Sequence, residues 1–433
     1  MSLREAVDVV VVGAGLAGLA AAGDLARSGL HVALLEAAPR PGGRMATDRV
    51  EGFLLDRGFQ VLNDAYPALC ARVDLAALGC RAFEPGARVR WQGGMHAVSD
   101  PLRHPRGLVS SLRAPFVAFS DMLPLLAMRR QLNRVAADPV QDTPQTTAPH
   151  SKAPQTTAQW LAQLGFSRDL VQALFRPLLA GILLDPALEA SSRRAAFALG
   201  WFAKGAAILP AEGMGAVPAA LAAALPAGVL QLSCPVESVQ PGKVVLRDGR
   251  AIMARAVVVA TDAQTAAEWV PGLPVVRWRG VIHMAFDAPR SPVRGGWLVL
   301  DGDGAGPVND LCVPSEVQPG YAPPGRALVS ATVLDSRGAK GSELEAAVRA
   351  QLRTWFGGEV DTWRTLRALA IERALVEQLP GNCPVGEPAL RASKGLYLAG
   401  DYLGLVSSQT ALASGAAVSQ LVRSDLEAPT PNA

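Results

Sequence analysis

The chain has 433 residues, of which 50% are apolar and 18% charged, and its net charge is +3. This much apolar material can bury a large core, so the composition excludes wholesale disorder and favours two domains over one. The small net charge and the lack of a basic run exclude an obvious nucleic-acid partner. The five cysteines show no metal-ligand spacing, which predicts reduced thiols, no metal site and a cytoplasmic protein.

The apolar segments leave membrane contact open. The first residues, MSLREAVDVVVVGAG, do not resemble a signal peptide, because their apolar run is short and leads into a glycine turn. No apolar run reaches the roughly 18 residues of a membrane-spanning helix. Mean hydropathy is nevertheless slightly positive. Segments 116–126 and 178–184 contribute to it, as buried helices, as a substrate channel, or as a face resting peripherally on a bilayer.

A βαβ unit is predicted near the start of the chain. Residues 7–12 are a nearly continuous β-branched run, which is typical of a strand buried on both faces of a parallel sheet. A helix from about Leu16 to Ser28 follows and is closed by Gly29. The second strand is expected over residues 31–35 and ends at Glu36.

The turn between the first strand and its helix reads Gly13-Ala14-Gly15-Leu16-Ala17-Gly18. Gly13 permits the tight turn, Gly15 lets a pyrophosphate approach the backbone, and Gly18 lets the helix pack on the strand. This motif alone is also compatible with a glycine-rich turn that binds no ligand, but its place between a strand and a helix favours a dinucleotide. Glu36 is spaced to accept the ribose hydroxyls of an adenosine, and its charge disfavours NADP.

A second motif distinguishes FAD from NAD. Arg44 lies eight residues after Glu36, in the run EAAPRPGGR over residues 36–44. This run resembles the signature of the flavin amine oxidase, protoporphyrinogen oxidase and carotenoid desaturase superfamily. In that superfamily the arginine after the glycine pair meets the FAD pyrophosphate. The role is physically reasonable, because two glycines bring the backbone close and a guanidinium neutralises the diphosphate.

Further motifs of the superfamily follow in the right order. Segment 53–60, FLLDRGFQ, resembles the part that passes the flavin ring, and segment 212–218 resembles the stretch that returns the chain to the FAD domain. Segment 234–239 resembles the strand whose valine backbone contacts adenine, and 396–401, LYLAGD, resembles the motif whose acid hydrogen-bonds the cofactor. The final helix, from about residue 410, is expected to direct its N-terminus at the pyrimidine edge of the flavin.

The motifs and the resemblance together imply FAD, bound noncovalently because segment 406–410 has no cysteine. The expected cofactor-binding residues are Gly13, Gly15, Leu16, Ala17, Gly18, Glu36, Ala37, Arg40, Gly43, Arg44, Arg57, Gly58, Phe59, Gln60, Val236, Thr261, Gly400, Asp401, Gln409 and Thr410.

Between the motifs, helices are expected over about 108–132, over 159–205 with breaks at Pro177 and Pro186, over 342–356 and over 410–423. Strands are expected over 229–232, 236–240, 244–247, 251–261, 280–287, 297–300, 309–313, 327–334 and 395–399. The tract 137–158, in which PQTTA occurs twice, is expected to be a low-complexity surface loop without a catalytic role.

These elements and the resemblance predict an α/β protein. A doubly wound, Rossmann-type FAD-binding domain is expected from residues 1–66, 208–275 and 376–433. It is interwoven with an α+β substrate domain from 67–207, largely helical, and 276–375. The active site is expected between the two domains, on the flavin face.

The reaction is narrowed by a departure from the family pattern. Many amine oxidases of the superfamily carry a lysine near the flavin, and the place expected for it here is Val281, on the strand 281–287. No lysine occurs between Lys243 and Lys340, which disfavours oxidative deamination. His283, on the same strand, is expected to be structural rather than a base. No catalytic side chain is nominated.

The resemblance, closest to the carotenoid desaturase branch, favours an FAD-dependent oxidoreductase that desaturates a hydrophobic isoprenoid or carotenoid-like polyene by hydride transfer to the flavin. Its electron acceptor would be oxygen or a quinone. The alternatives are a carotenoid cis–trans isomerase that uses reduced FAD, an amine or porphyrinogen oxidase, and a non-catalytic ligand-binding protein that retains FAD. The expected partner is a hydrophobic small molecule, with peripheral membrane contact left open.

Overall fold

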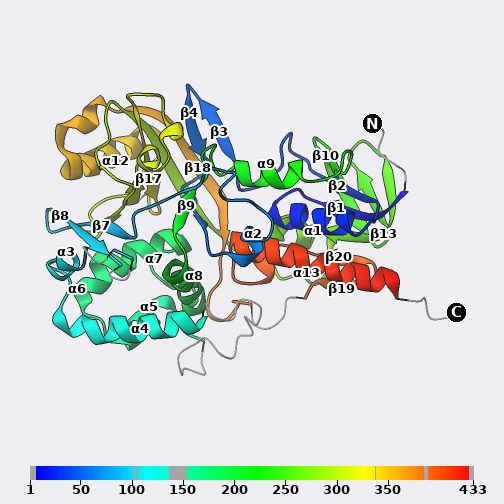
Figure 1. Ribbon diagram of the computed structural model, residues 1–433, viewed down its shortest axis with the longest axis horizontal. Coiled ribbons are helices and arrows are strands. Elements are labelled where there is room, and N and C mark those ends of the chain that lie inside the picture. Colours follow the sequence, from blue (N-terminus) through cyan, green and yellow to red (C-terminus); the bar gives the residue numbers. More distant parts are fainter. Residues whose placement is uncertain are drawn as a thin grey trace.

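The computed structural model describes residues 6–100, 103–104, 107–135, 154–336, 338–384 and 389–428. Two large sheets organise the molecule, one of eight strands and one of seven, and Figure 1 shows them side by side along the long axis. A helical layer lies below the second sheet in that view. The α/β class with a doubly wound first domain is therefore confirmed.

The first sheet collects strands from both ends and the middle of the chain. Its main path runs β10-β2-β1-β13-β12-β11, and β20 pairs with both β13 and β19. The strands are β1 (Ala6–Val12), β2 (Val32–Leu35), β10 (Leu230–Gln231), β11 (Val236–Gln240), β12 (Lys243–Leu246), β13 (Ala251–Val259), β19 (Arg391–Ser393) and β20 (Leu396–Leu398). Strands β10, β2, β1, β13 and β20 pair in parallel, so their carboxyl ends share one edge.

The first sheet is covered on both faces, as the β-branched run predicts. Val9 and Val11 of β1 pack towards α1 (Leu16–Arg27) and α13 (Ser408–Glu427), and Val10 packs on the other side towards β11 and β12. The two helices touch closely: a Cβ added to Gly415 of α13 would lie 2.3 Å from the carbonyl oxygen of Ala17. Helices α9 (Ala216–Ala223) and α10 (Ala263–Trp269) complete this part.

The second sheet has the strand order β18-β14-β17-β16-β15-β7-β8. Its strands are β7 (Gly86–Trp91), β8 (Gly94–Ser99), β14 (Trp278–Ala288), β15 (Leu298–Asp301), β16 (Val308–Cys312), β17 (Ala327–Val333) and β18 (Arg364–Val376). One face packs on α12 (Gly341–Phe356) through residues such as Met284, Val329 and Leu352. The alternate residues of β14 and β17, including His283 and Ser330, point to the opposite face.

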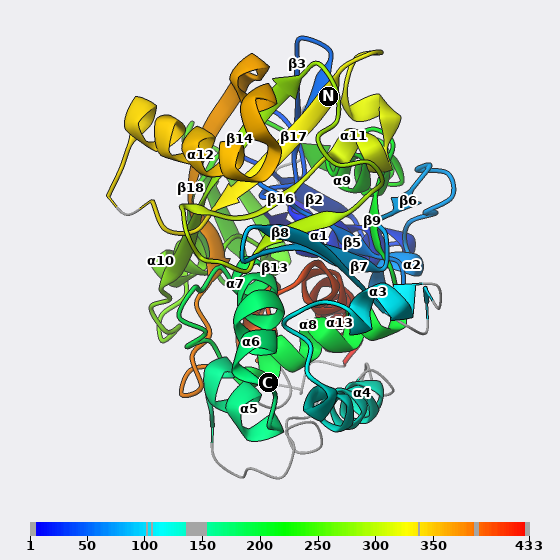
Figure 2. The ribbon, with the colours of Figure 1, turned by 90° about the vertical axis from the view of Figure 1, so that its left-hand side faces the viewer.

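A layer of helices packs against the β7 and β15 end of the second sheet (Figure 2). Its members are α3 (Leu108–Leu112), α4 (Met122–Val135), α5 (Thr157–Leu164), α6 (Arg168–Leu170), α7 (Arg176–Leu183) and α8 (Ser192–Lys204), with a 3-10 turn η2 (Phe119–Asp121), and a π-helical turn η3 (Val171–Phe175) precedes α7. Among the described residues, no helix combines the length and apolarity needed to cross a bilayer.

Short pieces join the two halves. They are the hairpin β3 (Thr47–Val50) and β4 (Phe53–Asp56), the small sheet β5 (Leu62–Asn63), β9 (Ala207–Leu209) and β6 (Arg81–Ala82), the helices α2 (Pro67–Cys70) and α11 (Pro314–Val317), and the 3-10 turns η4 (Pro319–Tyr321), η5 (Gly357–Thr362) and η6 (Asp401–Leu403).

Three features differ from the expectations. Residues 67–207 are not uniformly helical, because the β7–β8 hairpin extends the second sheet. Strand β18, which the sequence analysis does not assign, pairs with β14 along its length. Most of the tract 137–158 lies outside the described residues, but its end is no loop: Thr156 caps α5, and Gln159 returns a hydrogen bond to the Thr156 N–H at 2.9 Å.

Candidate functional site

The turn after β1 has a shape that two of its glycines make possible. Gly13 has a φ of +102°, and its N–H donates to the carbonyl at the end of β2 at 2.7 Å. A Cβ at Gly18 would lie 1.8 Å from the carbonyl oxygen of Gly13. A Cβ at Gly15 would meet no atom within 4 Å, and Gly15 is the N-cap of α1 without a side-chain cap. Gly15 thus borders open space, and the first turn of α1, in which Leu16 and Ala17 are buried, has no side-chain cap for its N–H groups.

Glu36 lies beside this turn, where β2 ends. One of its carboxylate oxygens accepts the N–H of Ala14 at 2.7 Å, and the other accepts that of Ala38 at 2.8 Å. Its carbonyl accepts the N–H of Cys234 at 2.8 Å, which brings the start of β11 alongside residues 36–38. The segments assigned from the sequence to the adenosine, Glu36 with Ala37 and the backbone before Val236, therefore lie together.

The second glycine loop rests on the first. Gly42 donates its N–H to the carbonyl of Ala14 at 2.8 Å. A Cβ at Gly43, whose φ is +58°, would lie 3.7 Å from the Cα of Gly15. The space in front of α1 is thereby bordered by two stretches of backbone without side chains. An extended phosphate group can approach both.

Arg44 connects the second glycine loop to a residue far along the sequence, Asp401. Its Nη2 donates to Oδ2 of Asp401 at 2.6 Å, and its guanidinium lies over the Trp278 ring at 5.7 Å from the centroid. The carboxylate of Asp401 raises the pKa of Arg44. Arg40 is more peripheral and lies 3.6 Å from the carboxylate of Asp48. Asp401 follows β20 after Ala399 and Gly400, so this ion pair lies at the carboxyl edge of the sheet.

The other expected residues border the same edge. Thr261 follows β13, and its nitrogen would lie 3.2 Å from a Cβ at Gly13. Gly400 donates its N–H to Oγ of Ser414 at 3.0 Å. At the start of α13, the N–H of Thr410 donates to Oγ of Ser407 at 3.0 Å. The buried Gln409 side chain accepts the N–H of Ala68 at 2.9 Å, so it holds α2.

The residues after β4 link this edge to the second sheet. Gly58 has a φ of +87°, and its Cβ position is 3.1 Å from Cδ1 of Ile371 on β18. Gln60 donates from Nε2 to the carbonyl of Arg44 at 3.0 Å. Phe59 packs edge-on against Phe83, and Arg57 donates from Nε to Asp48 at 3.2 Å.

The acid of this segment, Asp56, connects several separate segments through hydrogen bonds. Its carboxylate accepts the N–H of Met214 at 3.0 Å, the hydroxyl of Tyr321 at 2.8 Å and the hydroxyl of Thr47. These partners come from three separate segments. Burial raises the pKa of Asp56, while the hydrogen bonds favour its charged form.

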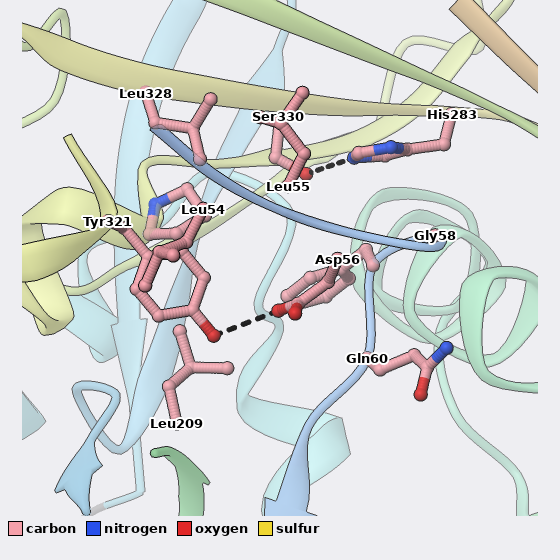
Figure 3. A pocket seen from close by; sticks show the side chains of 12 residues that line it. Leu54, Leu55, Asp56, Gly58, Gln60, Leu209, His283, Tyr321, Leu328 and Ser330 are labelled. Carbon is pink, nitrogen blue, oxygen red and sulfur yellow. Dashed lines mark hydrogen bonds between the residues drawn. The ribbon is translucent and has the colours of Figure 1, made fainter. Parts of the chain in front are cut away.

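A pocket opens between β4 and the second sheet (Figure 3). Its apolar lining consists of Leu54, Leu55, Phe59, Leu209, Pro314 and Leu328. Its polar lining consists of Asp56, Gln60, His283, Tyr321 and Ser330. In Figure 3 the Asp56 and Tyr321 side chains point to each other, as do those of His283 and Ser330. The hydrogen-bonding groups of the wall are therefore largely occupied.

His283 is neutral in this wall. It is 4% exposed, and its Nε2 lies 2.8 Å from Oγ of Ser330. Burial, followed by the charge of Arg367, lowers the pKa of His283 to about 4. Its Nδ1 has no hydrogen-bond partner among the described residues. Val281, the position expected for a lysine, pairs with Ile371 on β18, the residue that Gly58 approaches.

The glycine loops, the uncapped α1 N-terminus, Glu36 and the cation at Arg44 fit FAD at the carboxyl edge of a parallel sheet. This is the class of dinucleotide-binding flavoproteins. Comparison with known proteins agrees. The chain belongs to the flavin containing amine oxidoreductase family, which it matches over residues 16–423. It is accordingly an FAD-dependent oxidoreductase.

Individual relatives match only in part. A protein of Mycobacterium tuberculosis named as a flavin-containing monoamine oxidase is 33% identical over 132 residues, which are 30% of this chain and 26% of that one. Putrescine oxidase of Kocuria rosea is 41% identical over 97 residues, 22% of this chain and 19% of its own. The matches thus span about a quarter or less of these relatives.

Solved structures show the same fold over nearly the whole chain. Putrescine oxidase bound to putrescine has a TM-score of 0.72 at 19% identity and covers 97% of this chain and 99% of its own. Cyclohexylamine oxidase from Brevibacterium oxydans has a TM-score of 0.70 at 20% identity, and the match covers 98% of this chain and 100% of that one.

Several site residues carry no signal that the sequence analysis could use. Trp278, Ser330 and Tyr321 belong to strands or turns without a motif. Arg194 is fully buried in α8, where burial lowers its pKa to about 10, and it donates to the carbonyl of Val406 at 3.3 Å. Only the three-dimensional pairing of distant segments brings these side chains to the site.

Proposed function

We propose that the protein oxidises an uncharged, apolar substrate by hydride transfer to FAD, and that this substrate is an isoprenoid or carotenoid-like polyene which it desaturates. The observation that carries the proposal is the wall of the pocket beside β4. Six of its side chains are apolar, and its histidine is neutral. A protonated amine would find no free carboxylate there, because Asp56 already accepts three hydrogen bonds.

The strand β14 supports the same proposal. It lacks a lysine, and Val281 and Ile371 form an apolar pair where the second sheet approaches Gly58. Desaturation removes a hydride and a proton from adjacent carbons: bound FAD would accept the hydride, the proton would be released to solvent, and oxygen or a quinone would reoxidise the flavin by taking up two electrons and two protons. The contribution of the chain is to exclude water and to orient the alkene against the apolar part of the wall.

The deciding experiment is co-expression in hosts that accumulate different polyene precursors, followed by mass analysis of the products. A loss of about two mass units per step supports desaturation. Gly15→Val, which places a side chain in the space before α1, is the control and should abolish the change. An unchanged mass with altered chromatographic retention indicates isomerisation instead. An unchanged pigment profile in every host rejects the polyene.

A second candidate is oxidation of a primary amine, which the family membership favours. Anaerobic mixing with a panel of monoamines and diamines distinguishes the two candidates by loss of flavin absorbance. Rapid bleaching by one amine, with release of peroxide in air, would replace the polyene proposal. Bleaching by neither substrate class would favour a protein that retains FAD without turnover.

We further propose that FAD is held without a covalent bond. The segment 406–410 has no cysteine, and the expected ring-side residues are Gly58, Gln60 and Thr410. Acid precipitation should therefore leave the flavin in the supernatant, measured by its fluorescence. Flavin that stays in the pellet after protease digestion would contradict this.

An apolar substrate of this kind partitions into lipid, so the proposed function also implies collection from a bilayer and peripheral contact with it.

A further inference from the structure

Helices α3 and α4, with the turn η2 between them, carry apolar side chains that face solvent. Eight large hydrophobic side chains are exposed among the described residues, and five of them lie between residues 109 and 126. Their exposed fractions are 54% for Val109, 51% for Leu112, 94% for Phe119, 78% for Leu123 and 56% for Leu126. We call these five residues of α3, η2 and α4 the α3–α4 patch.

Helical spacing places three members on one face. Phe119, Leu123 and Leu126 are separated by four and three residues, so they line one side of η2 and α4. The opposite side, with Met128 and Leu132, is buried in the core beneath the helices. Helix α4 is therefore apolar on both sides, whereas a surface helix of a soluble protein has a polar outer face.

Two exposed arginines, Arg113 and Arg130, accompany the patch, and Arg130 follows Leu126 by four residues on the same side of α4. Arg129 is paired with Asp100 at 2.9 Å. Asp121, the acid within η2, is fully buried, and its carboxylate accepts the N–H groups of Ala118 and Ser167. The charges of α3, η2 and α4 that face solvent in the described residues are therefore those of arginines.

Exposed apolar side chains together with exposed arginines indicate what kind of partner would bind the α3–α4 patch. An apolar face edged by arginines fits an anionic bilayer, because the alkyl parts enter the acyl region while guanidinium groups stay among the phosphates. A second copy of the same cationic surface would be repelled. In Figure 1 α4 lies at the outer edge of the helical layer, at the opposite end of the molecule from β10 and β13.

We propose that the α3–α4 patch is a peripheral docking surface for anionic lipid bilayers. The docked face lies on the helical layer and not on the FAD domain. Helix α4 packs on α8, and α8 in turn packs through Phe197 and Trp201 against Tyr66 and Leu405, next to the start of α13. The proposal does not depend on which substrate the pocket takes.

The test uses the FAD-loaded full chain and sedimentation with vesicles. Vesicles of phosphatidylcholine alone are compared with vesicles containing about 30 mol% phosphatidylglycerol, at about 0.1 M salt. We expect about tenfold stronger binding to the anionic vesicles and a decline of this preference as salt rises. Equal, negligible binding to both vesicle types would overturn the proposal.

Variants locate the surface. The double variant Phe119→Asp with Leu123→Asp should lower vesicle binding at least tenfold, and Arg113→Gln with Arg130→Gln should remove most of the anionic preference. Val275→Asp is the matched control, since Val275 is 93% exposed outside the patch, and it should bind as the unchanged protein does. FAD content and circular dichroism confirm that each variant is folded.

Two outcomes would reassign the patch. Unchanged vesicle binding by the folded Phe119→Asp with Leu123→Asp variant would show that another surface meets lipid. A dimer in light scattering that this variant abolishes, without vesicle binding by the parent protein, would show that the patch covers a second copy. Because neither readout uses substrate, failure here is distinguishable from failure of the proposed reaction.

Discussion

The carboxyl edge of the first sheet and the pocket face of the second sheet are built differently. At the edge, function depends on backbone: glycines, an uncapped helix N-terminus and one ion pair, Arg44 with Asp401. At the pocket face, function depends on side chains from β4, β14 and β17 that close on one another. On the proposed function, the first region selects the cofactor and the second selects the substrate. A family can therefore keep the first region while it changes the second.

Among substitutions at the carboxyl edge of the first sheet, we expect the largest effect on FAD binding and stability at Gly18. Gly18→Ala puts a Cβ where 1.8 Å separates it from the Gly13 carbonyl, so we expect loss of FAD and about 3 kcal/mol or more of destabilisation. The control is Gly23→Ala in the same helix, whose Cβ would meet Leu225 at an ordinary 3.6 Å. That control should gain up to about 1 kcal/mol in unfolding free energy. Retained flavin in Gly18→Ala would refute the close packing.

The ion pair at the edge is tested by Asp401→Asn and Arg44→Met. Asp401→Asn removes the negative charge of the acceptor, and Arg44→Met removes the donor together with the cation expected at the diphosphate. FAD affinity in apoprotein titrations should fall by about ten- to a hundredfold, or roughly 1.5–3 kcal/mol. Arg49→Ala, which breaks the exposed pair with Glu212, should leave it unchanged. Equal effects of Arg49 and Arg44 substitutions would contradict the assignment.

At the pocket face, the buried neutral state of His283 can be tested by measuring stability as the pH is lowered. Its pKa in the folded state is about 4, below the ordinary value of 6.5, so its buried form is neutral. The unfolded chain takes up the proton first, and stability is lost as pH falls from about 6.5 towards 4. Between pH 7 and 5 this histidine should account for about 2 kcal/mol of the loss. Urea titrations of His283→Gln should show that much less pH dependence, and an identical dependence would exclude a buried neutral histidine.

Glu36→Ala is the smallest change that we expect to detect. It removes the carboxylate beside the glycine turn and leaves the N–H groups of Ala14 and Ala38 without their acceptor. FAD retention after extensive dialysis should fall, by about 1–2 kcal/mol in affinity. Full flavin occupancy after dialysis would exclude Glu36 as a cofactor contact.

The same contrast explains what sequence reasoning could predict. Strand β1 and the turn at Gly13 could be predicted, because a β-branched run and three glycines are local signals. Strand β18 was not, since RTLRALAIERALV is rich in Leu, Ala and Arg, residues that favour helix, and its pairing with β14 overrides that preference. Thr156 was assigned to a loop because composition outweighed its capping box with Gln159.

The residues of the candidate site also differ in whether the sequence alone could indicate them. The residues proposed to hold the cofactor could be nominated because most of them belong to local sequence motifs. Ser330, Tyr321 and Arg194 were not, because their positions depend on pairings between segments far apart in sequence. Position His283 was singled out, but the sequence contains nothing that identifies its partner Ser330 as the residue 2.8 Å away.

The parallel core of the first sheet has a consequence for biosynthesis. Strand β1 pairs with β13, and β13 pairs with β20, so residues near 10, 257 and 397 must meet to form adjacent strands. Gly400 and Asp401, at the proposed cofactor edge, are synthesised long after β1. The nascent β1 can pair early with β2, but it lacks β13, and β13 lacks β20, until those distant segments have been made. We therefore expect FAD to bind only after the chain has been made as far as α13.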